Sequence, residues 1–337
     1  MGDDSNNKSE WPKAPTAYRS FYRKDCSRFT YAIGFVMASV ISVAYFLTPV
    51  YSLSCLILLV SNPFSSFTWK FSSLFILSIL MPCVTMPDLV HLMTPVLEYF
   101  QYEEVFEFDY PEWLERTNNG EKFIIPSHPH GVISYAGICL KIACPMEFSH
   151  VPTAVASAVM KTPILKQVMG CFSLTDVSKR NMRKVLETNG PDGTMFIYPG
   201  GIAELFKSNL KEERLYLQKR KGFVKFALQS GTDIVPLYLF GNSSVLSVLS
   251  TGTLASISRK IQASITYFWG QWGMPFPRSG HKCMSVLGRP LGMPKIEEPT
   301  QEDIDKWHAI WLDEVRRIYE KYQEKLPEYK NKPLFID

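Results

Sequence analysis

The feature that most constrains this chain is a stretch of 59 residues, 29–87, that carries a single charged side chain, Lys70. Charged residues make up 20% of the whole sequence, so an even spread would place about 12 of them here. Such a segment is stable only in lipid or in a very dry core. The chain is 337 residues long and 46% apolar, enough for one large or two ordinary domains, which excludes disordered and collagen-like chains.

The uncharged stretch contains two apolar runs separated by turn residues. The first run, 31–60, has 30 residues, and a helix needs about 20 to cross the hydrocarbon core. Pro49 is expected to interrupt it, residues 61–66 supply a turn, and 71–87 adds 17 uncharged residues. The sequence therefore predicts an N-terminal transmembrane or re-entrant helical hairpin over 29–87. The alternative is one span followed by a helix lying on the membrane.

Basic residues before the first run predict its orientation. Residues 19–28 contain four basic residues and one acidic residue, Asp25. The basic residues are Arg19, Arg23, Lys24 and Arg28. By the positive-inside rule residues 1–28 form a cytosolic tail, and a hairpin returns residues 88–337 to the cytosol. Asn242 begins a glycosylation sequon, so a glycan on Asn242 would reverse this topology.

Beyond residue 87 the pattern is that of an α/β protein, in which β-rich runs alternate with helical ones. The predicted strands are 122–126, 151–156, 194–198, 234–240, 265–268 and 283–287. The predicted helices before the last are 163–169, 178–188 and 213–230. A final helix is capped by Thr300 and Asp303 and has apolar residues at three- and four-residue steps.

Charge balance and missing motifs exclude several function classes. The chain has 36 basic and 32 acidic residues, a balance that argues against a nucleic-acid-binding protein. Its seven cysteines form no CxxC pair, so reduced thiols and no metal site are expected. Serine hydrolase, P-loop NTPase and zinc protease signatures are absent.

The sharpest local motif is Ser127-His128-Pro129-His130-Gly131, which follows a strand-like run and precedes an apolar segment. A loop at the end of a strand is where an α/β sheet presents reactive groups. Because an imidazole titrates near neutral pH, either histidine suits a general base. A solvated loop histidine or a core histidine bonded to backbone remains an equally weighted alternative.

A second motif, Pro199-Gly200-Gly201 followed by Glu204, again joins a strand to a predicted helix start. Paired glycines let backbone N–H groups approach an anionic oxygen. Glu204 would lie in the first helical turn, either as a catalytic group or as a complement to the helix dipole. The glycines alone are also compatible with nothing more than a tight turn.

A third cluster, Lys219-Arg220-Lys221-Gly222-Phe223, lies on the helix predicted at 213–230. Its basic face suits the phosphates of a large anionic cosubstrate or anionic lipid headgroups. A solvated face is the more common explanation of such a run.

Taken in order, these motifs resemble the type-2 diacylglycerol acyltransferase family, which includes monoacylglycerol and wax-alcohol acyltransferases. The matching segments after the apolar hairpin are His128-Pro129-His130-Gly131, Pro199-Gly200-Gly201 with Glu204, Arg220-Lys221-Gly222-Phe223-Val224, Val235 to Gly241, and Pro294-Lys295 to His308. The resemblance covers nearly the whole chain and implies a glycerolipid-acyltransferase-like mixed sheet flanked by helices. Residues 88–337 would then be the acyltransferase domain.

The resemblance also implies roles for these residues. Related glycerolipid acyltransferases have an Asp five residues after a His, but Ile133 and Tyr135 stand at those positions here. The resemblance implies that His130 is the base, with His128 as a second catalytic candidate and Glu204 as the group that orients the imidazole. Gly200 and Gly201 would stabilise the oxyanion, and Arg220 would bind the CoA phosphates. The remaining substrate-binding candidates are Pro129, Gly131, Gly222 and Phe223.

The implied activity is acyl-CoA-dependent esterification of diacylglycerol to triacylglycerol, with no covalent enzyme intermediate and no cofactor besides the cosubstrate acyl-CoA. Monoacylglycerol or a long-chain alcohol is an alternative acceptor. A thioesterase and a non-catalytic membrane lipid-binding protein are the competing functions. The resemblance places the protein in the endoplasmic reticulum membrane with its catalytic domain facing the cytosol, and leaves a homo-oligomer open.

Overall fold

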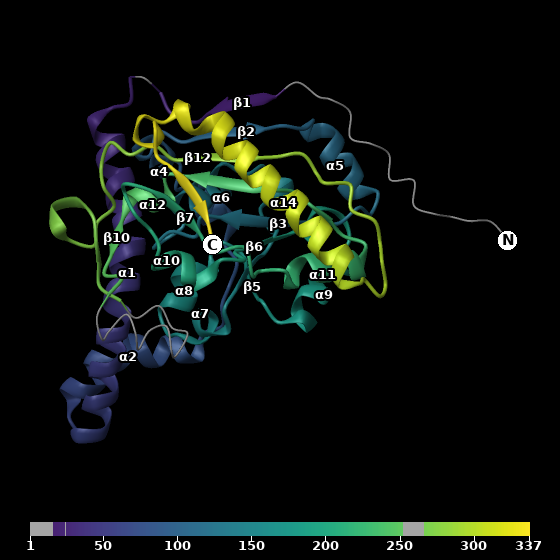
Figure 1. Cartoon of the computed structure of the whole chain (residues 1–337). Coiled ribbons are helices and arrows are strands. Elements are labelled where there is room, and N and C mark those ends of the chain that lie inside the picture. The colour runs from purple at the N-terminus through teal and green to yellow at the C-terminus, as the bar shows by residue number, and fades with distance from the viewer. Residues whose placement is uncertain (1–15, 24, 252–265) are drawn as a thin grey trace.

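A computed structural model describes residues 16–23, 25–251 and 266–337, and Figure 1 shows their arrangement. The predictions that rest on Lys24, on Ile265 and on residues 1–15 lie outside these described residues. The chain folds around one large mixed sheet, with helices on both faces. This confirms the predicted α/β class.

The central sheet has the order β1-β2-β12-β9-β3-β6-β4-β5, with β8 paired to β3. Its strands are β1 (Ala17–Ser20), β2 (Glu103–Phe106), β3 (Phe123–His128), β4 (Thr153–Val155), β5 (Leu174–Asp176), β6 (Met195–Ile197), β8 (Asp233–Ile234), β9 (Leu237–Phe240) and β12 (Met284–Leu287). The pairs among β5, β4, β6, β3, β8 and β9 are parallel, whereas β12 runs antiparallel to β9. β3 therefore lies in the middle of the sheet, where both of its faces are covered.

Helices cover both faces of this sheet and divide the interior into two apolar clusters. One cluster contains α4 (Pro95–Tyr99) and α6 (Tyr135–Ala143), and the other contains α11 (Gly222–Ser230) and α14 (Gln301–Tyr322). The predicted cap of the last helix is confirmed, because the Thr300 side chain and the Asp303 side chain each accept the other's backbone N–H. The described part of the body also contains the short helices α3 (Pro87–His91), α5 (Tyr110–Asn118), α7 (Ser157–Lys161), α8 (Leu165–Gly170), α9 (Lys179–Leu186), α10 (Gly201–Leu205) and α12 (Asn242–Val245).

The apolar N-terminal stretch forms α1 (Arg28–Ser61) and α2 (Ser66–Leu80). The predicted interruption at Pro49 is wrong, because α1 runs through it for 34 residues. A proline removes one helical hydrogen bond, which a helix of this length can lose. Among the described residues α1 alone is long and apolar enough to cross a membrane. The 15 residues of α2 span about 22 Å, less than the ~30 Å of a hydrocarbon core.

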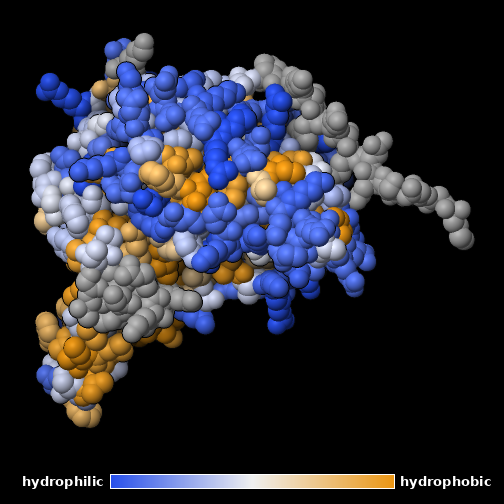
Figure 2. All heavy atoms as spheres, viewed as in Figure 1, coloured by the Kyte–Doolittle hydropathy of each residue, from blue (hydrophilic) through white to orange (hydrophobic). Residues whose placement is uncertain are grey.

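The first half of α1 packs against the body, and its second half projects beyond it together with α2. A Cβ on Gly34 would overlap the carbonyl of Pro95 in α4, and the Tyr135 hydroxyl donates to the carbonyl of Ala38 at 2.8 Å. The projecting part forms the hydrophobic foot that Figure 2 shows. Phe64, in the turn between α1 and α2, is 99% exposed. An exposed apolar surface of this size suggests membrane association.

Residues 213–221 are not helical, so the prediction of one helix over 213–230 is wrong for its first half. β7 (Glu213–Leu215) pairs in parallel with β13 (Leu334–Ile336), a strand more than a hundred residues away. The helix begins only at Gly222. A second short pair, β10 (Ser247–Val248) with β11 (Phe268–Trp269), lies beside α1. The predicted strand at 234–240 is split into β8 and β9 around Pro236, which has no N–H to donate.

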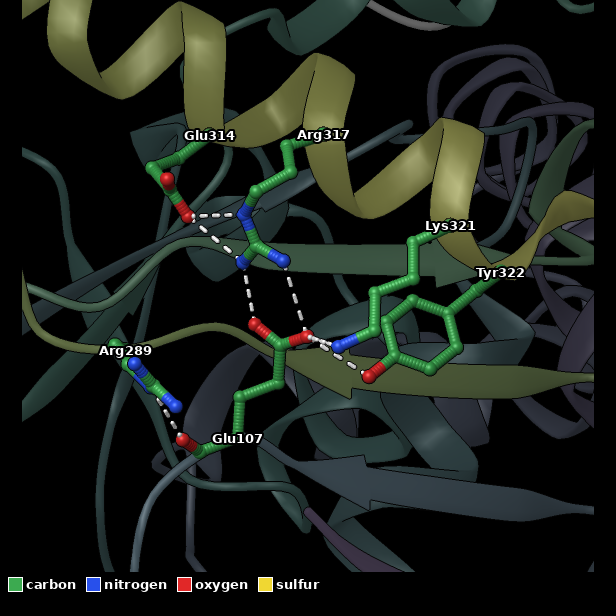
Figure 3. A network of polar contacts seen from close by, with 6 residues as sticks. All are labelled: Glu107, Arg289, Glu314, Arg317, Lys321 and Tyr322. Atoms are coloured by element: carbon green, nitrogen blue, oxygen red, sulfur yellow. Dashed lines mark hydrogen bonds and ion pairs between the residues drawn. The ribbon is translucent and has the colours of Figure 1, made fainter. Parts of the chain in front are cut away.

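A buried carboxylate at the end of β2 ties the sheet to α14 (Figure 3). Glu107 accepts hydrogen bonds from the Arg317 guanidinium, from Lys321 Nζ at 2.7 Å and from the Tyr322 hydroxyl at 2.8 Å. The backbone carbonyl of Glu107 also accepts from Arg289 Nε at 3.1 Å. Burial by itself would raise the pKa of Glu107, but these donors lower it to about 2. The carboxylate is therefore charged and fully paired at neutral pH.

Candidate active site

The structure separates the two histidines of the predicted motif. β3 ends at His128, whose ring lies fully buried between Tyr238 and Trp311, with ring centroids 5.3 Å and 5.6 Å away. Within the described residues neither of its ring nitrogens has a hydrogen-bond partner. Burial lowers the pKa of His128 to about 3, so the imidazole is neutral. His128 thus belongs to the core formed by α11 and α14.

His130 lies past the cis peptide bond between His128 and Pro129, and its side chain is only partly buried. Its Nδ1 is 2.8 Å from the backbone carbonyl oxygen of Gly131. Since a carbonyl can only accept, Nδ1 carries the proton and Nε2 keeps its lone pair. Burial lowers the pKa of His130, although the bond to Gly131 opposes this, so the ring is neutral at physiological pH. A neutral imidazole with a fixed tautomer is the form that a general base requires.

Glu204 connects the two predicted motifs, because its carboxylate reaches from α10 to the histidine loop. Oε2 accepts the backbone N–H of His130 at 2.9 Å, and Oε1 accepts the backbone N–H of Tyr216 at 3.3 Å. The side chain is buried, which raises the pKa of Glu204 to about 7 in spite of both bonds. This contact differs from the predicted one. The carbonyl of Gly131 orients the imidazole, and Glu204 instead holds the backbone that carries it.

The two glycines before Glu204 face different surroundings. A Cβ on Gly200 would overlap the Glu204 carboxyl group, whereas a Cβ on Gly201 would meet nothing within 4 Å. Gly201 also has φ of +53°, a left-handed conformation that favours glycine. The backbone at Gly201 is therefore open to close approach by a ligand, and Gly200 leaves the space that Glu204 occupies.

Tyr198 forms one wall of the site. Its ring centroid lies 5.1 Å from that of His130 in an edge-to-face contact, and its hydroxyl is 2.8 Å from the Ser134 Oγ. Burial raises the pKa of Tyr198 to about 12, so its hydroxyl stays protonated. Tyr198 also lines a small cavity together with Ser127 and Lys141. Lys141 is buried there and donates to the carbonyl of Val151.

Asn242 organises the histidine loop from the end of β9, a role that the sequence did not indicate. Its Nδ2 donates to the Pro129 carbonyl and to Ser134 Oγ, each at 2.9 Å. Its Oδ1 accepts the backbone N–H of Ala136 at 2.8 Å. The rule that polar residues after buried strands line the site would have found it. Since Asn242 is 1% exposed and fully bonded, its sequon is inaccessible in the fold and no longer tests topology.

A buried ion pair, Lys332 with Glu213, contacts the turn that contains Asn242. Lys332 Nζ lies 3.1 Å from Glu213 Oε2 on β7. The hydroxyl of Ser243, the residue next to Asn242, donates to the same carboxylate at 2.7 Å. Both charged side chains are almost completely buried, so each neutralises a charge that burial would otherwise make very costly. The segment before β13 therefore fixes the position of the histidine loop through Ser243 and Asn242.

The basic cluster divides between the surface and the core. Arg220 is exposed and its guanidinium lies 5.0 Å from the ring centroid of Tyr216, whose amide binds Glu204. Phe223 instead packs on Trp311 with ring centroids 4.8 Å apart, on the same side of the sheet as His128. Gly222 is the first residue of α11. Of these candidates the structure therefore places Arg220 near the site and directs the Phe223 side chain into the core.

We expect Gly131→Ala to destabilise the protein far more than Gly120→Ala. Both glycines have positive φ, +65° and +99°, which costs an alanine about 1 kcal/mol. A Cβ on Gly131 would also lie 2.5 Å from the carbonyl oxygen of Asn242, whereas one on Gly120 meets nothing within 4 Å. Overpacking should bring the loss for Gly131→Ala to roughly 3 kcal/mol. Urea unfolding of the two variants measures the difference, and equal losses would contradict the close packing of Gly131.

The sequence of this chain is similar to those of a known protein family and of several named proteins. The sequence model of a family described as "Diacylglycerol acyltransferase" matches residues 96–337. A protein named diacylglycerol O-acyltransferase 2 from Danio rerio is 29% identical over 238 residues, which cover 64% of this chain and 66% of the relative. The Homo sapiens protein of that name is 29% identical over 245 residues, covering 65% and 62%. The matched part thus spans slightly less than two thirds of each relative's length.

Proposed function

This chain belongs to the diacylglycerol acyltransferase family, and on that premise we propose that it transfers an acyl group from acyl-CoA to the free hydroxyl of diacylglycerol, forming triacylglycerol. The observation that carries the proposal is the junction of the two motifs. The bond from His130 Nδ1 to Gly131 fixes the tautomer and leaves Nε2 with its lone pair, and the glutamate of the Pro-Gly-Gly turn binds the backbone amide of His130. The names of the relatives support the substrate class.

In the proposed mechanism His130 acts as general base without a covalent enzyme intermediate. Nε2 removes the proton from the lipid hydroxyl as its oxygen attacks the thioester carbonyl carbon. The tetrahedral intermediate then collapses, the C–S bond breaks, and the CoA thiolate takes the proton from the imidazolium. The carbonyl of Gly131 accepts from Nδ1–H throughout and stabilises the positive charge of the ring.

The oxyanion of the tetrahedral intermediate is proposed to bind backbone N–H groups at Gly200 and Gly201. The open space around Gly201 supports this role, since a thioester oxygen can reach the backbone there. Glu204, from the following turn, holds the amide of His130. The base and the oxyanion donors are therefore fixed relative to each other by one carboxylate.

Arg220 is proposed to bind the phosphates of CoA. We expect Arg220→Glu to raise the apparent KM for acyl-CoA by roughly tenfold, because a charge-assisted bond to phosphate is replaced by repulsion. The KM for diacylglycerol should change little. Arg316→Glu, an equal change of charge on a partly exposed residue of α14, is the matched control. An equal rise in both KM values for Arg220→Glu would instead indicate a structural role.

We further propose that the protein resides in the endoplasmic reticulum membrane with the site facing the cytosol. The length and hydropathy of α1 and the apolar surface of α2 support membrane attachment. The arginines Arg19, Arg23 and Arg28 before α1 support a cytosolic N-terminus. A site at the membrane surface brings the base to a lipid hydroxyl and limits hydrolysis of the thioester by water.

One assay distinguishes this function from its alternatives. Membranes that contain the protein are incubated with labelled oleoyl-CoA and a panel of acceptors, and the lipid products are separated by class. Labelled triacylglycerol formed only with added diacylglycerol supports the proposal. Diacylglycerol or wax ester as the main product would assign a monoacylglycerol or alcohol acceptor. Free oleate without ester would identify a thioesterase, and the absence of any product with retained lipid binding would leave a lipid-binding protein.

A further inference from the structure

An acid-free stretch occupies the part of the chain between β8 and α14. From residue 234 to residue 296 there is no Asp or Glu, although 32 acidic residues in 337 would place about six in 63 positions. Basic residues are not depleted there: Arg259, Lys260, Arg278, Lys282, Arg289 and Lys295. A segment that carries no carboxylate can approach phospholipid headgroups without electrostatic repulsion.

The centre of this stretch presents large apolar side chains to the outside. Residues 266–276, which we call the aromatic loop, include Tyr267, Trp272 and Met274, which are 45%, 73% and 51% exposed. Trp272 also has φ of +56°, a left-handed conformation that is costly for a bulky residue. Residues held in a strained conformation cluster at sites that contact a ligand or a partner.

The aromatic loop packs directly on the membrane helix. Phe46 of α1 lies 5.7 Å from Tyr267 and 5.4 Å from Phe268, measured between ring centroids. About three turns closer to the N-terminus of α1, the ring centroid of Phe35 lies 5.8 Å from that of Trp272. The loop is therefore continuous with α1, along the half of the helix that packs against the body.

The exposed side of α1 is apolar along both halves of the helix. Its outward-facing residues run from the level of the aromatic loop to the foot: Val36, Val40, Leu47, Val50, Leu53, Ile57 and Val60. The 24 residue steps from Val36 to Val60 correspond to about 36 Å, more than the ~30 Å of hydrocarbon in a bilayer. A bilayer that covers this side of α1 therefore extends to the level of the aromatic loop.

We propose that the aromatic loop is a second membrane-contact surface, which rests in the headgroup region of a phospholipid bilayer beside α1. Trp and Tyr favour this region because their rings are apolar and their polar atoms remain hydrated. The body of the protein therefore contacts the membrane surface directly and is not separated from it by a projecting part of α1. This surface is independent of the proposed reaction, so it holds whatever the acceptor is.

Tryptophan quenching by brominated lipids tests the proposal. The full chain is reconstituted in phosphatidylcholine vesicles with bromine on the acyl chain, either near the headgroup or near the chain end. The difference in emission between wild type and Trp272→Phe isolates Trp272, since the other tryptophans cancel. We expect this difference to be quenched by brominated lipid, and more strongly when the bromine lies near the headgroup.

Trp307→Phe is the matched control, because Trp307 packs against the core formed by α11 and α14 on the opposite face of the sheet. Its difference emission should be the same in brominated and plain vesicles. Trp272→Tyr gives a second difference for the same position and guards against misfolding of one variant. The emission of Trp69 in the foot, isolated in the same way with Trp69→Phe, shows that the protein is inserted when brominated lipid quenches it. If Trp69 is quenched but the Trp272 emission is equally bright in brominated and plain vesicles, the proposal is overturned. Retained or lost acyltransferase activity does not affect this result.

Discussion

Replacing His130 with alanine is expected to lower kcat by about 10²- to 10⁴-fold, the usual contribution of a positioned general base. His128→Leu should retain most of the activity. The reason is that the His128 ring is buried between Tyr238 and Trp311, with neither nitrogen bonded within the described residues. Leucine fills a similar volume without a polar atom to bury. Product formation per minute, with saturating acyl-CoA and diacylglycerol, measures both effects.

Two further observations decide how this pair of variants is interpreted. Thermal unfolding of His130→Ala should resemble that of wild type, since the side chain is only partly buried. Its acyl-CoA KM should also change little if the imidazole acts only in the transition state. Loss of activity in His128→Leu with an intact fold, or retention of it in His130→Ala, would reverse the assignment of the two histidines.

Replacing Glu107 with glutamine is expected to lower the free energy of unfolding by about 3 kcal/mol, the loss typical of breaking a buried, multiply bonded ion pair. The network in Figure 3 explains the size of this loss in stability, because one buried carboxylate accepts hydrogen bonds from Arg317, Lys321 and Tyr322. Glu314→Gln is the matched control, because Glu314 contacts Arg317 from a partly exposed position. Exposed pairs of that kind contribute at most about 1 kcal/mol. Denaturant titration of both variants distinguishes them.

The same carboxylate predicts an acid dependence of stability. The pKa of Glu107 is lowered in the fold to about 2 from 4.5, so the unfolded chain binds its proton more tightly than the folded one. The stabilisation is therefore fully present above pH ~4.5 and is lost as the pH falls toward 2. The Glu107→Gln variant should lack this part of the acid transition. An acid titration of unfolding that is identical in wild type and variant would contradict it.

Sequence patterns found the central strands because parallel strands buried on both faces are short, continuous apolar runs. β3, β4, β6 and β12 all lie within or next to their predicted ranges. The same reasoning missed β7, because a strand of three residues is stabilised by its partner, and that partner, β13, lies more than a hundred residues later. Local propensity carries no information about such a partner.

At the candidate site the sequence predicted residues but not the contacts that they make. It singled out His130, Glu204 and the glycines between them through their order and spacing. The resemblance implied that Glu204 orients the imidazole, whereas in the structure its carboxylate accepts the backbone N–H of His130. The sequence patterns also overlooked Asn242, which bonds to residues 113 and 106 positions away.

The sequence by itself determined that this chain has an apolar N-terminal segment, an α/β body, a histidine loop and a glycine turn, since each is encoded in a local pattern of residue types. Only the tertiary structure decided which histidine is reachable, what fixes its tautomer and which carboxylate holds its backbone. The physical reason is that hydrogen bonds and burial depend on distances between residues far apart in the chain. Those distances are set by the packing of the whole sheet and its helices.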